Sequence, residues 1–269
     1  MKKWRYLPYE VHTGAENMAI DEAILLGLRS EGWEATLRFY GWNPATLSLG
    51  YAQSYAKEVD EEACKAEGLD IVRRPTGGRA VLHQYELTYS VIAPEKEENV
   101  AGTVIESYLK ISQALLKAFQ TLGIPAEMVA HANMKELSSA ACFDAPSWYE
   151  LVVAGRKLVG SAQVRKDGVL LQHGSIILHF DADLLFRVLK FPSEEVRKRL
   201  LQSFKRKACA LDEVWPKPVS RAELETAICQ GFEEVMGIKL EGGTLSEGER
   251  SLLSELTGKY LSEEWTKKR

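Results

Sequence analysis

Ser138–Leu178 reads SSAACFDAPSWYELVVAGRKLVGSAQVRKDGVLLQHGSIIL and predicts a run of strands joined by tight turns. The expected strands are Trp148–Val153, Lys157–Val164 and Val169–His179. Ala154-Gly155 and Lys166-Asp167-Gly168 supply the turns, because glycine tolerates the positive φ that a tight hairpin requires. A cysteine, Cys142, precedes the first strand in an irregular segment. The stretch therefore combines predicted hairpins with a cysteine, whose thiol can be reactive.

Strand alternation indicates a pocket rather than a core. With a period of two, Lys157, Val159, Ser161 and Gln163 share one face of the second predicted strand. A lysine with small and polar neighbours is unusual in a core but suits the lining of a pocket. An exposed hairpin lysine is an equally good interpretation of Lys157.

Composition excludes several classes of protein. The 269 residues are 45% hydrophobic, enough for one large core or two modest ones. A net charge of −4 argues against a dedicated nucleic-acid binder. Neither a membrane span nor a signal peptide is indicated, so we expect a cytoplasmic protein. The four cysteines are widely spaced without a C-x-x-C pair, so neither a disulfide framework nor a metal site is predicted.

The remaining pattern predicts helices around a sheet. Apolar spacing predicts helices over Glu16–Leu28 and Gly102–Leu122. Residues 71–92 read as three strands, and the pairs Ser220/Glu223 and Ser246/Glu249 are capping boxes. Leu211–Val219, with two prolines, is a plausible linker. We therefore expect an α/β (α+β) fold with a mixed, largely antiparallel sheet, a catalytic body over residues 1–210 and a helical extension over residues 211–269.

Adjacent glycines at Gly77-Gly78 interrupt the predicted strands of residues 71–92. They can let backbone amides approach a ligand, although a plain tight hairpin is the more common use of such a pair. Arg73, Arg74 and Arg79 flank them. Guanidinium groups can clamp a phosphate or carboxylate, but arginines at strand ends are more often solvated.

Two histidines and one cysteine are candidates for chemistry. His83 precedes a turn, and His173 lies in an apolar strand beside Gly174; for each, a hydrogen-bonded structural role is the simpler interpretation. Cys142 differs from Cys64 and Cys229, which fall in periodic helical segments typical of core thiols, and from Cys209, which follows a basic run. A loop cysteine can be a nucleophile if a cation such as Lys157 favours its thiolate.

Several motifs together resemble the lipoate-protein ligase and octanoyltransferase superfamily. They are NMAIDEA (17–23), RRPTGGRAVLH (73–83), ELTYS (86–90) and GRKLVGSAQ (155–163). The segment ACFDAPSWYE (141–150) resembles the branch that transfers octanoyl groups from acyl carrier protein to the H protein of the glycine cleavage system. The resemblance runs from about residue 4 to the end of the chain.

This resemblance implies a catalytic fold of the biotin/lipoate protein ligase type. It implies that Cys142 is the acyl-accepting nucleophile and that Lys157 contacts the acyl carbonyl. The Arg73–Arg79 loop, His83 and the region from Gln163 to Gly174 would form the acyl pocket. Two positions depart from the family pattern: Arg79 stands where ATP-using ligases usually have a small residue, and Gln84 follows His83 where an aspartate is common.

The implied reaction moves an octanoyl group from a carrier-protein thioester to a lysine of a lipoyl-domain protein. A thioester is already activated, so we expect neither ATP, another cofactor nor a metal to be required. Two alternatives remain. One is an ATP-dependent lipoate-protein ligase, and the other is a non-catalytic protein that binds an acyl chain or a lipoyl domain.

Overall fold

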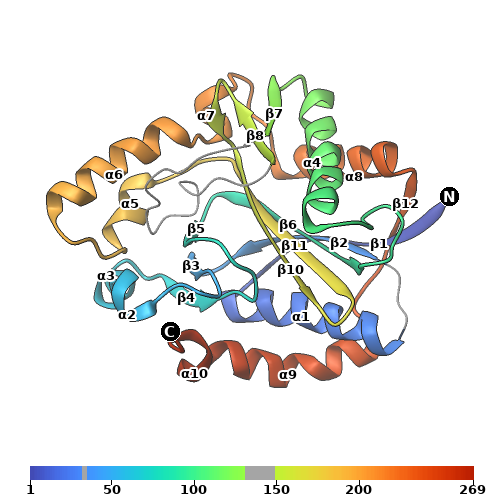
Figure 1. Cartoon of the computed structure of the whole chain (residues 1–269), viewed down its shortest axis with the longest axis horizontal. Helices are drawn as coiled ribbons and strands as arrows, with labels where there is room; N and C mark the ends of the chain where they lie inside the picture. Colours follow the sequence, from blue (N-terminus) through green and yellow to red (C-terminus); the bar gives the residue numbers. More distant parts are fainter. Residues whose placement is uncertain (32–34, 131–148) are drawn as a thin grey trace.

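The computed structural model describes residues 1–31, 35–130 and 149–269 (Figure 1). A six-stranded sheet forms its centre, in the order β10-β11-β6-β2-β1-β12. Pairing is antiparallel from β10 to β2 and parallel where β1 meets β2 and β12. The strands are β1 (Lys2–His12), β2 (Thr36–Trp42), β6 (Glu86–Pro94), β10 (Val159–Lys166), β11 (Val169–Ile177) and β12 (Ile238–Gly242).

Helices cover both faces of this sheet. On one face α4 (Val104–Thr121) packs with α8 (Arg221–Met236), and on the other α1 (Gly14–Glu31) packs with α9 (Glu247–Leu261) (Figure 1). The strands β6 and β11 are buried along almost their whole length because they lie between these helical layers. Both strands nevertheless carry polar residues, among them Ser90 in β6 and His173 in β11, which are buried with the rest of the strand.

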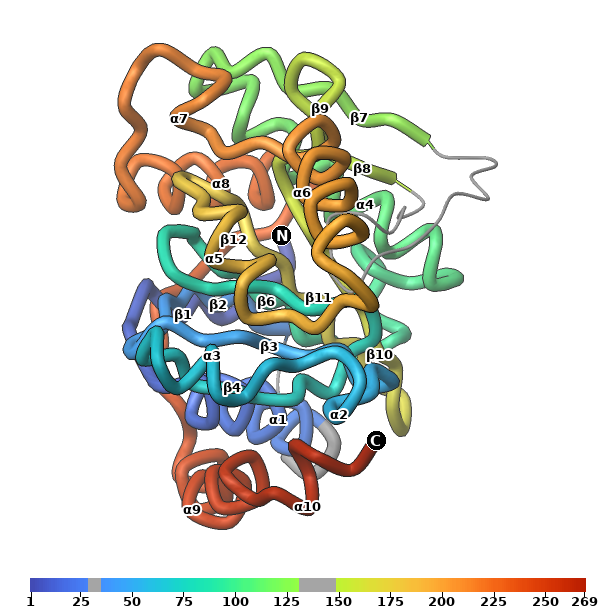
Figure 2. Tube along the Cα trace, turned by 90° about the vertical axis from the view of Figure 1, so that its left-hand side faces the viewer, coloured from blue at the N-terminus to red at the C-terminus, as the bar shows by residue number. Residues whose placement is uncertain are grey.

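Two three-stranded sheets flank the central one. The first, ordered β4-β3-β5, contains β3 (Thr46–Leu49), β4 (Asp70–Arg73) and β5 (Val81–His83). The second, ordered β7-β8-β9, contains β7 (Ala126–Ala130), β8 (Tyr149–Val153) and β9 (Arg156–Lys157). The shorter helices are α2 (Tyr55–Glu58), α3 (Glu61–Ala66), α5 (Ala182–Arg187), α6 (Glu194–Lys207), α7 (Leu211–Val214) and α10 (Glu263–Thr266). The C-terminal end lies beside α2 (Figure 2), where the Tyr55 amide donates to the Arg269 carbonyl at 2.7 Å.

The predicted α+β class and the mixed, largely antiparallel sheet are confirmed. The helix predicted over Gly102–Leu122 is α4, which begins after a Thr103 capping box. Both predicted capping boxes are present, with Ser220 starting α8 and Ser246 starting α9. These local signals worked because each depends on residues three or four apart in the sequence.

The strand predicted over Lys157–Val164 is confirmed from Val159 onward, but its start is wrong, because the chain changes sheets at Leu158. Lys157 ends β9, whereas β10 begins at Val159 in the central sheet. The fully buried Leu158 donates its amide to the Leu151 carbonyl and accepts from the Ile177 amide, so it bridges two sheets. Lys157 therefore does not belong to the alternation that places residues along β10.

The segment after residue 210 is more than a helical tail. Its residues 211–214, expected in a linker, form α7, and Leu211 is buried in the main core. Strand β12 pairs in parallel with β1 and so joins the central sheet. The boundary between a body at 1–210 and an extension at 211–269 stays a proposal. No helix in the described parts of the chain is both long and apolar enough to cross a membrane.

Candidate active site

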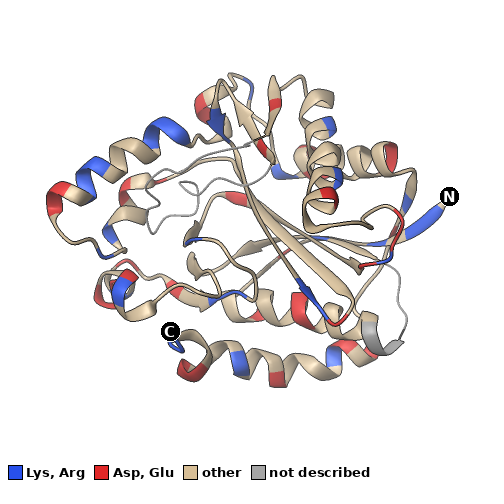
Figure 3. Cartoon of the chain, viewed as in Figure 1, with Lys and Arg blue, Asp and Glu red and all other residues tan. Residues whose placement is uncertain are grey.

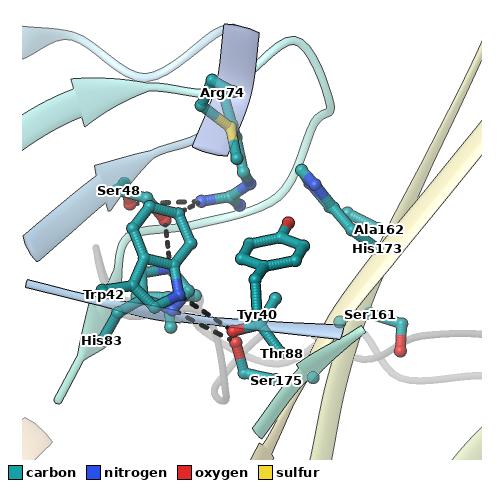
Figure 4. Close-up of a pocket in the computed structure, with 14 residues that line it drawn as sticks. Tyr40, Trp42, Ser48, Arg74, His83, Thr88, Ser161, Ala162, His173 and Ser175 are labelled. Carbon is teal, nitrogen blue, oxygen red and sulfur yellow. Dashed lines mark hydrogen bonds between the residues drawn. The ribbon is translucent and has the colours of Figure 1, made fainter. Parts of the chain in front are cut away.

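A narrow pocket lies between the central sheet and the β4-β3-β5 sheet (Figure 4). Helix α1 contributes Met18 to the lining of the pocket. Its lining residues are Met18, Tyr40, Trp42, Ser48, Arg74, Val81, His83, Thr88, Gly160, Ser161, Ala162, His173, Gly174 and Ser175. Four of the site residues predicted from sequence therefore meet in one cavity: His83, Ser161, His173 and Gly174.

His83 is held against one wall of this pocket. Its ring stacks on Trp42 with 3.9 Å between centroids and 19° between planes (Figure 4). Its Nε2 lies 2.8 Å from Ser48 Oγ, and its Nδ1 lies 3.4 Å from both Ser175 Oγ and Glu86 Oε1. Burial lowers the pKa of His83. The ring is thus a fixed, neutral hydrogen-bonding group at neutral pH.

His173 connects the pocket to a buried carboxylate. Its Nε2 lies 2.6 Å from Thr76 Oγ1, and its Nδ1 lies 3.4 Å from Asp21 Oδ2. Thr76 Oγ1 accepts from Arg74 Nε at 3.2 Å, which leaves the threonine hydroxyl proton for His173 Nε2. We therefore assign the Nδ1–H tautomer to His173, with this proton directed at Asp21. Burial lowers the pKa of His173 as well.

Asp21 is a fully buried carboxylate with several donors around it. Arg38 Nη1 donates at 2.7 Å, and the hydroxyls of Tyr40 and Ser90 donate at 2.9 Å each. Burial acts to raise the pKa of Asp21, but Arg38 and His173 outweigh it and hold the pKa below its usual value. Sequence reasoning assigned Asp21 no role. An aspartate on the apolar face of a predicted helix was the available signal.

The glycine loop over the pocket is tied down by Arg74. Its Nη2 donates to the carbonyls of Gly77 at 2.8 Å and Arg79 at 2.7 Å. Gly78 has a φ of 90°, which a turn glycine adopts readily. At Gly77, in contrast, φ is outside the left-handed region, and an added Cβ would meet no atom of the described residues within 4 Å. Neither turn geometry nor packing within the chain therefore requires glycine at position 77.

The three arginines of this region have different surroundings. Arg73 is fully buried and donates to the carbonyls of Gly50, Gln53 and Thr266, so it braces a neighbouring loop and α10 and does not line the pocket. Arg79 is partly exposed, with Nη1 3.6 Å from Glu58 Oε2. Arg74 alone of the three lines the pocket. The sequence pattern could not tell Arg73 from Arg74, because the two are adjacent at the end of one strand.

The opposite wall depends on close packing between β10 and β11. Ser161 Oγ lies 2.7 Å from the Tyr89 hydroxyl. A Cβ on Gly174 would overlap Ser161 Oγ and would lie 2.7 Å from a Tyr89 ring carbon. Glycine at 174 therefore makes room for this pair. Gln163 lies farther along β10, donates to Ser107 Oγ and Gln172 Oε1 at 3.0 Å each, and does not line the pocket.

Lys157 is a buried lysine and not an exposed hairpin residue. Its exposure is 4%, and its Nζ lies 2.8 Å from Glu150 Oε1. Its carbonyl accepts from the Cys209 amide at 3.0 Å, which fixes β9 against the segment after α6. Lys157 is not among the residues that line the pocket. Sequence alone did not indicate Glu150 as its partner.

Cys142 lies outside the described residues. The other three cysteines are poor candidates for a thiolate. Burial raises the pKa of Cys64 to about 12, of Cys209 to about 11 and of Cys229 to about 12. A thiol with such a pKa is almost fully protonated at neutral pH and reacts slowly.

Comparison with known proteins places this geometry in a family. The model of the lipoyl protein ligase A/B catalytic domain matches residues 13–233. The chain belongs to this family. Proteins named octanoyltransferase LipM are similar along the whole chain: that of Geobacillus kaustophilus is 50% identical over 99% of this chain and 98% of its own, and that of Bacillus subtilis is 47% identical with the same coverage. The lipoyl protein ligase A/B domain described here is thus that of an acyltransferase.

Solved structures support the same fold. An archaeal bi-partite lipoate protein ligase from Thermoplasma acidophilum has a TM-score of 0.81, 27% identity and coverage of 99% of this chain and 97% of its own. A lipoate-protein ligase A bound with ATP also has a TM-score of 0.81 and 27% identity, with 99% of both chains covered. The expected biotin/lipoate ligase type of catalytic fold is therefore confirmed for this lipoyl protein ligase A/B family member.

Proposed function

We propose that the protein transfers an octanoyl group from a carrier-protein thioester to a lysine of a lipoyl-domain protein such as the glycine cleavage H protein. The observation that carries this proposal is the end-to-end similarity, at 47–50% identity, to relatives named octanoyltransferase LipM. The narrow pocket supports it, because Met18, Trp42 and Val81 offer apolar surface to a chain. Each methylene buried there would contribute about 0.8 kcal/mol.

The proposed first step forms an acyl-enzyme. The Cys142 thiolate attacks the thioester carbonyl, the bond from carbonyl carbon to carrier sulfur breaks, and the carrier leaves as a thiolate that takes a proton from solvent. In the second step the neutral amine of the acceptor lysine attacks the Cys142 thioester, an amide forms, and the Cys142 thiolate is released. The amine proton passes to solvent. No ATP and no metal enters this scheme, because a thioester is already activated.

Lys157 would stabilise the oxyanion that develops in both steps. A preorganised donor of this kind typically contributes 10²–10³ in rate. Its burial and its contact with Glu150 support the assignment, because they hold the Nζ group in one orientation. In the same scheme Gly77 would let the loop backbone approach the substrate, since no atom of the described residues fills the space beside it.

One experiment separates this function from its alternatives. The protein is incubated with octanoyl carrier protein and apo H protein, with and without ATP and magnesium, and octanoylated H protein is measured by intact mass. Equal transfer without ATP is expected. A lipoate-protein ligase is the second candidate, because a ligase bound with ATP shares the fold. Efficient attachment of free lipoate that requires ATP would favour the ligase, and binding without any transfer would favour a non-catalytic protein.

A further inference from the structure

Helix α6 has a charge opposite to that of the chain as a whole. Its sequence over Glu194–Lys207, EEVRKRLLQSFKRK, contains six lysines or arginines and two glutamates. The whole chain contains 34 Lys and Arg against 38 Asp and Glu. Figure 3 shows the resulting basic stretches along α6 at the edge of the molecule. A local positive charge of this kind attracts an anionic partner.

The cations lie in rows on the outer side of α6. Leu201 and Phe204 are buried and fix the helix against the core. Lys198 and Lys205 are seven residues apart, as are Arg199 and Arg206, so each pair shares a face of the helix. All four are exposed. A rigid element thus presents a basic stripe to solvent.

The stability of the helix accounts for only part of this stripe, through the last-turn cations and the contacts of Arg197 and Lys198 with Glu194. Cations in the last turn are favoured by the helix dipole, but Arg197, Lys198 and Arg199 lie near the N-terminal end, where the dipole disfavours them. Lys198 and Lys205 contact Glu194 and Asp183, respectively. Arg199 and Arg206 have no ion-pair partner among the residues that the structure describes. These two charges are available to a partner.

The position of α6 connects the stripe with the active site. Directly after the helix, Ala208 forms a bridge with Lys157. A groove with about 830 Å³ of empty space runs beside the end of α6, lined by Phe204, Lys205 and the turn residue Tyr85 among others. That turn follows His83, which lines the active-site pocket. The stripe therefore flanks a hollow whose residue Gln84 directly follows His83 of the pocket in sequence.

We propose that the outer face of α6 binds an acidic face of the acyl-carrying donor protein. This inference rests on the proposed function, because it assumes a protein-bound thioester donor. Charge complementarity favours the donor over the acceptor. A phosphopantetheine arm brings an anionic phosphodiester toward the site, whereas the acceptor must bring a lysine amine, which is a cation in solution. Complementary charge of this kind mainly raises the rate of encounter and is screened by salt.

The test compares two matched double charge reversals. The variant Arg199→Glu/Arg206→Glu is set against Lys96→Glu/Lys166→Glu, which changes net charge equally at two exposed lysines on the far side of the molecule. With octanoyl carrier protein at low salt, kcat/KM should fall tenfold or more for the α6 variant and less than twofold for the control. The difference should shrink at high salt. With octanoyl-pantetheine as donor, both variants should match the wild-type protein.

Three results would overturn the proposal. The first is an unchanged kcat/KM with octanoyl carrier protein. The second is an equal loss with octanoyl-pantetheine, which would show that α6 acts on the site itself. The third is a loss confined to transfer from preformed acyl-enzyme to apo H protein, which would assign the stripe to the acceptor. Failure of the proposed function is distinguishable, because the wild-type protein would then transfer no octanoyl group from either donor.

Discussion

The Nζ atom of Lys157 lies 2.8 Å from Oε1 of Glu150, and both side chains are buried. Glu150 belongs to β8 and Lys157 to β9, so the pairing of these two short strands holds the ion pair. A buried lysine whose Nζ atom contacts a carboxylate is held in one orientation. This arrangement suits a group that stabilises an oxyanion and does not suit a solvated surface lysine.

Replacing Lys157 should therefore lower catalysis strongly. We expect Lys157→Ala to reduce the transfer rate by about 10²–10³ and Lys157→Arg to restore little of it, because the planar guanidinium is larger than an ammonium. Lys166→Ala, an exposed lysine on the next strand, is the control and should keep full activity. Since Glu150 loses its lysine partner, Lys157→Ala should also lower the free energy of unfolding by about 3 kcal/mol in urea titrations. A wild-type transfer rate would remove Lys157 from the mechanism.

Gly77 and Gly174 should respond differently to alanine. Gly77→Ala has room for its Cβ, so its stability should stay within about 0.5 kcal/mol of wild type while transfer falls, because the methyl group occupies space meant for substrate. Gly174→Ala should lose both stability and activity, because its Cβ overlaps Ser161 and Tyr89. Thermal unfolding and transfer assays on the two proteins check this. Full activity of Gly77→Ala would make that residue an ordinary hairpin glycine.

Stability should fall with acidity through the two pocket histidines. Burial lowers the pKa of His83 and His173 in the folded chain, whereas an unfolded histidine titrates at about 6.5. As pH falls below this value the unfolded state binds protons that the folded state does not, so the free energy of unfolding drops by up to about 1.4 kcal/mol per pH unit for each ring. The loss levels off below the folded pKa. Urea titrations at a series of pH values from 7.5 to 5.5 give the free energy of unfolding at each pH. This free energy should depend less steeply on pH for His173→Gln than for the wild-type protein. An unchanged pH dependence of the free energy of unfolding would contradict the assignment of a neutral buried ring.

Sequence patterns recovered those features that depend on near neighbours. The apolar stripe of α4 and the Ser220 and Ser246 capping boxes are local, and all were correct. The resemblance motifs also identified the correct family. The change of sheets at Leu158 was missed because β9 and β10 are separated by a single residue, and a period of two continues across that residue.

Features made by distant residues could not be predicted in this way. Asp21 reaches His173 from a helix that is more than a hundred residues earlier in the chain. Arg73 and Arg74 are adjacent in sequence, yet one braces α10 and the other lines the pocket. Strand β12 joins the sheet beside β1, and only the complete fold brings the two together. Such relationships require tertiary structure.

Cysteine reactivity should single out one thiol. At pH 7.5 iodoacetamide should modify Cys142 first, because burial raises the pKa of Cys64, Cys209 and Cys229 to about 11–12. Peptide mass analysis of partially labelled native protein measures the order. Cys64→Ala, Cys209→Ala and Cys229→Ala should each keep transfer activity. Labelling of all four residues at equal rates in the folded protein would contradict an activated Cys142.

The central claim is an acyl-enzyme on Cys142, and trapping it is the most direct test. The protein is mixed with octanoyl carrier protein alone, without acceptor and without ATP, and analysed by intact and peptide mass. We expect a gain of one octanoyl group on Cys142, because replacing the carrier thioester by a Cys142 thioester is close to thermoneutral. Neutral hydroxylamine should release this group, and Cys142→Ala should not acquire it. Transfer to apo H protein without any adduct on Cys142, or an adduct on Lys157 instead, would contradict the account.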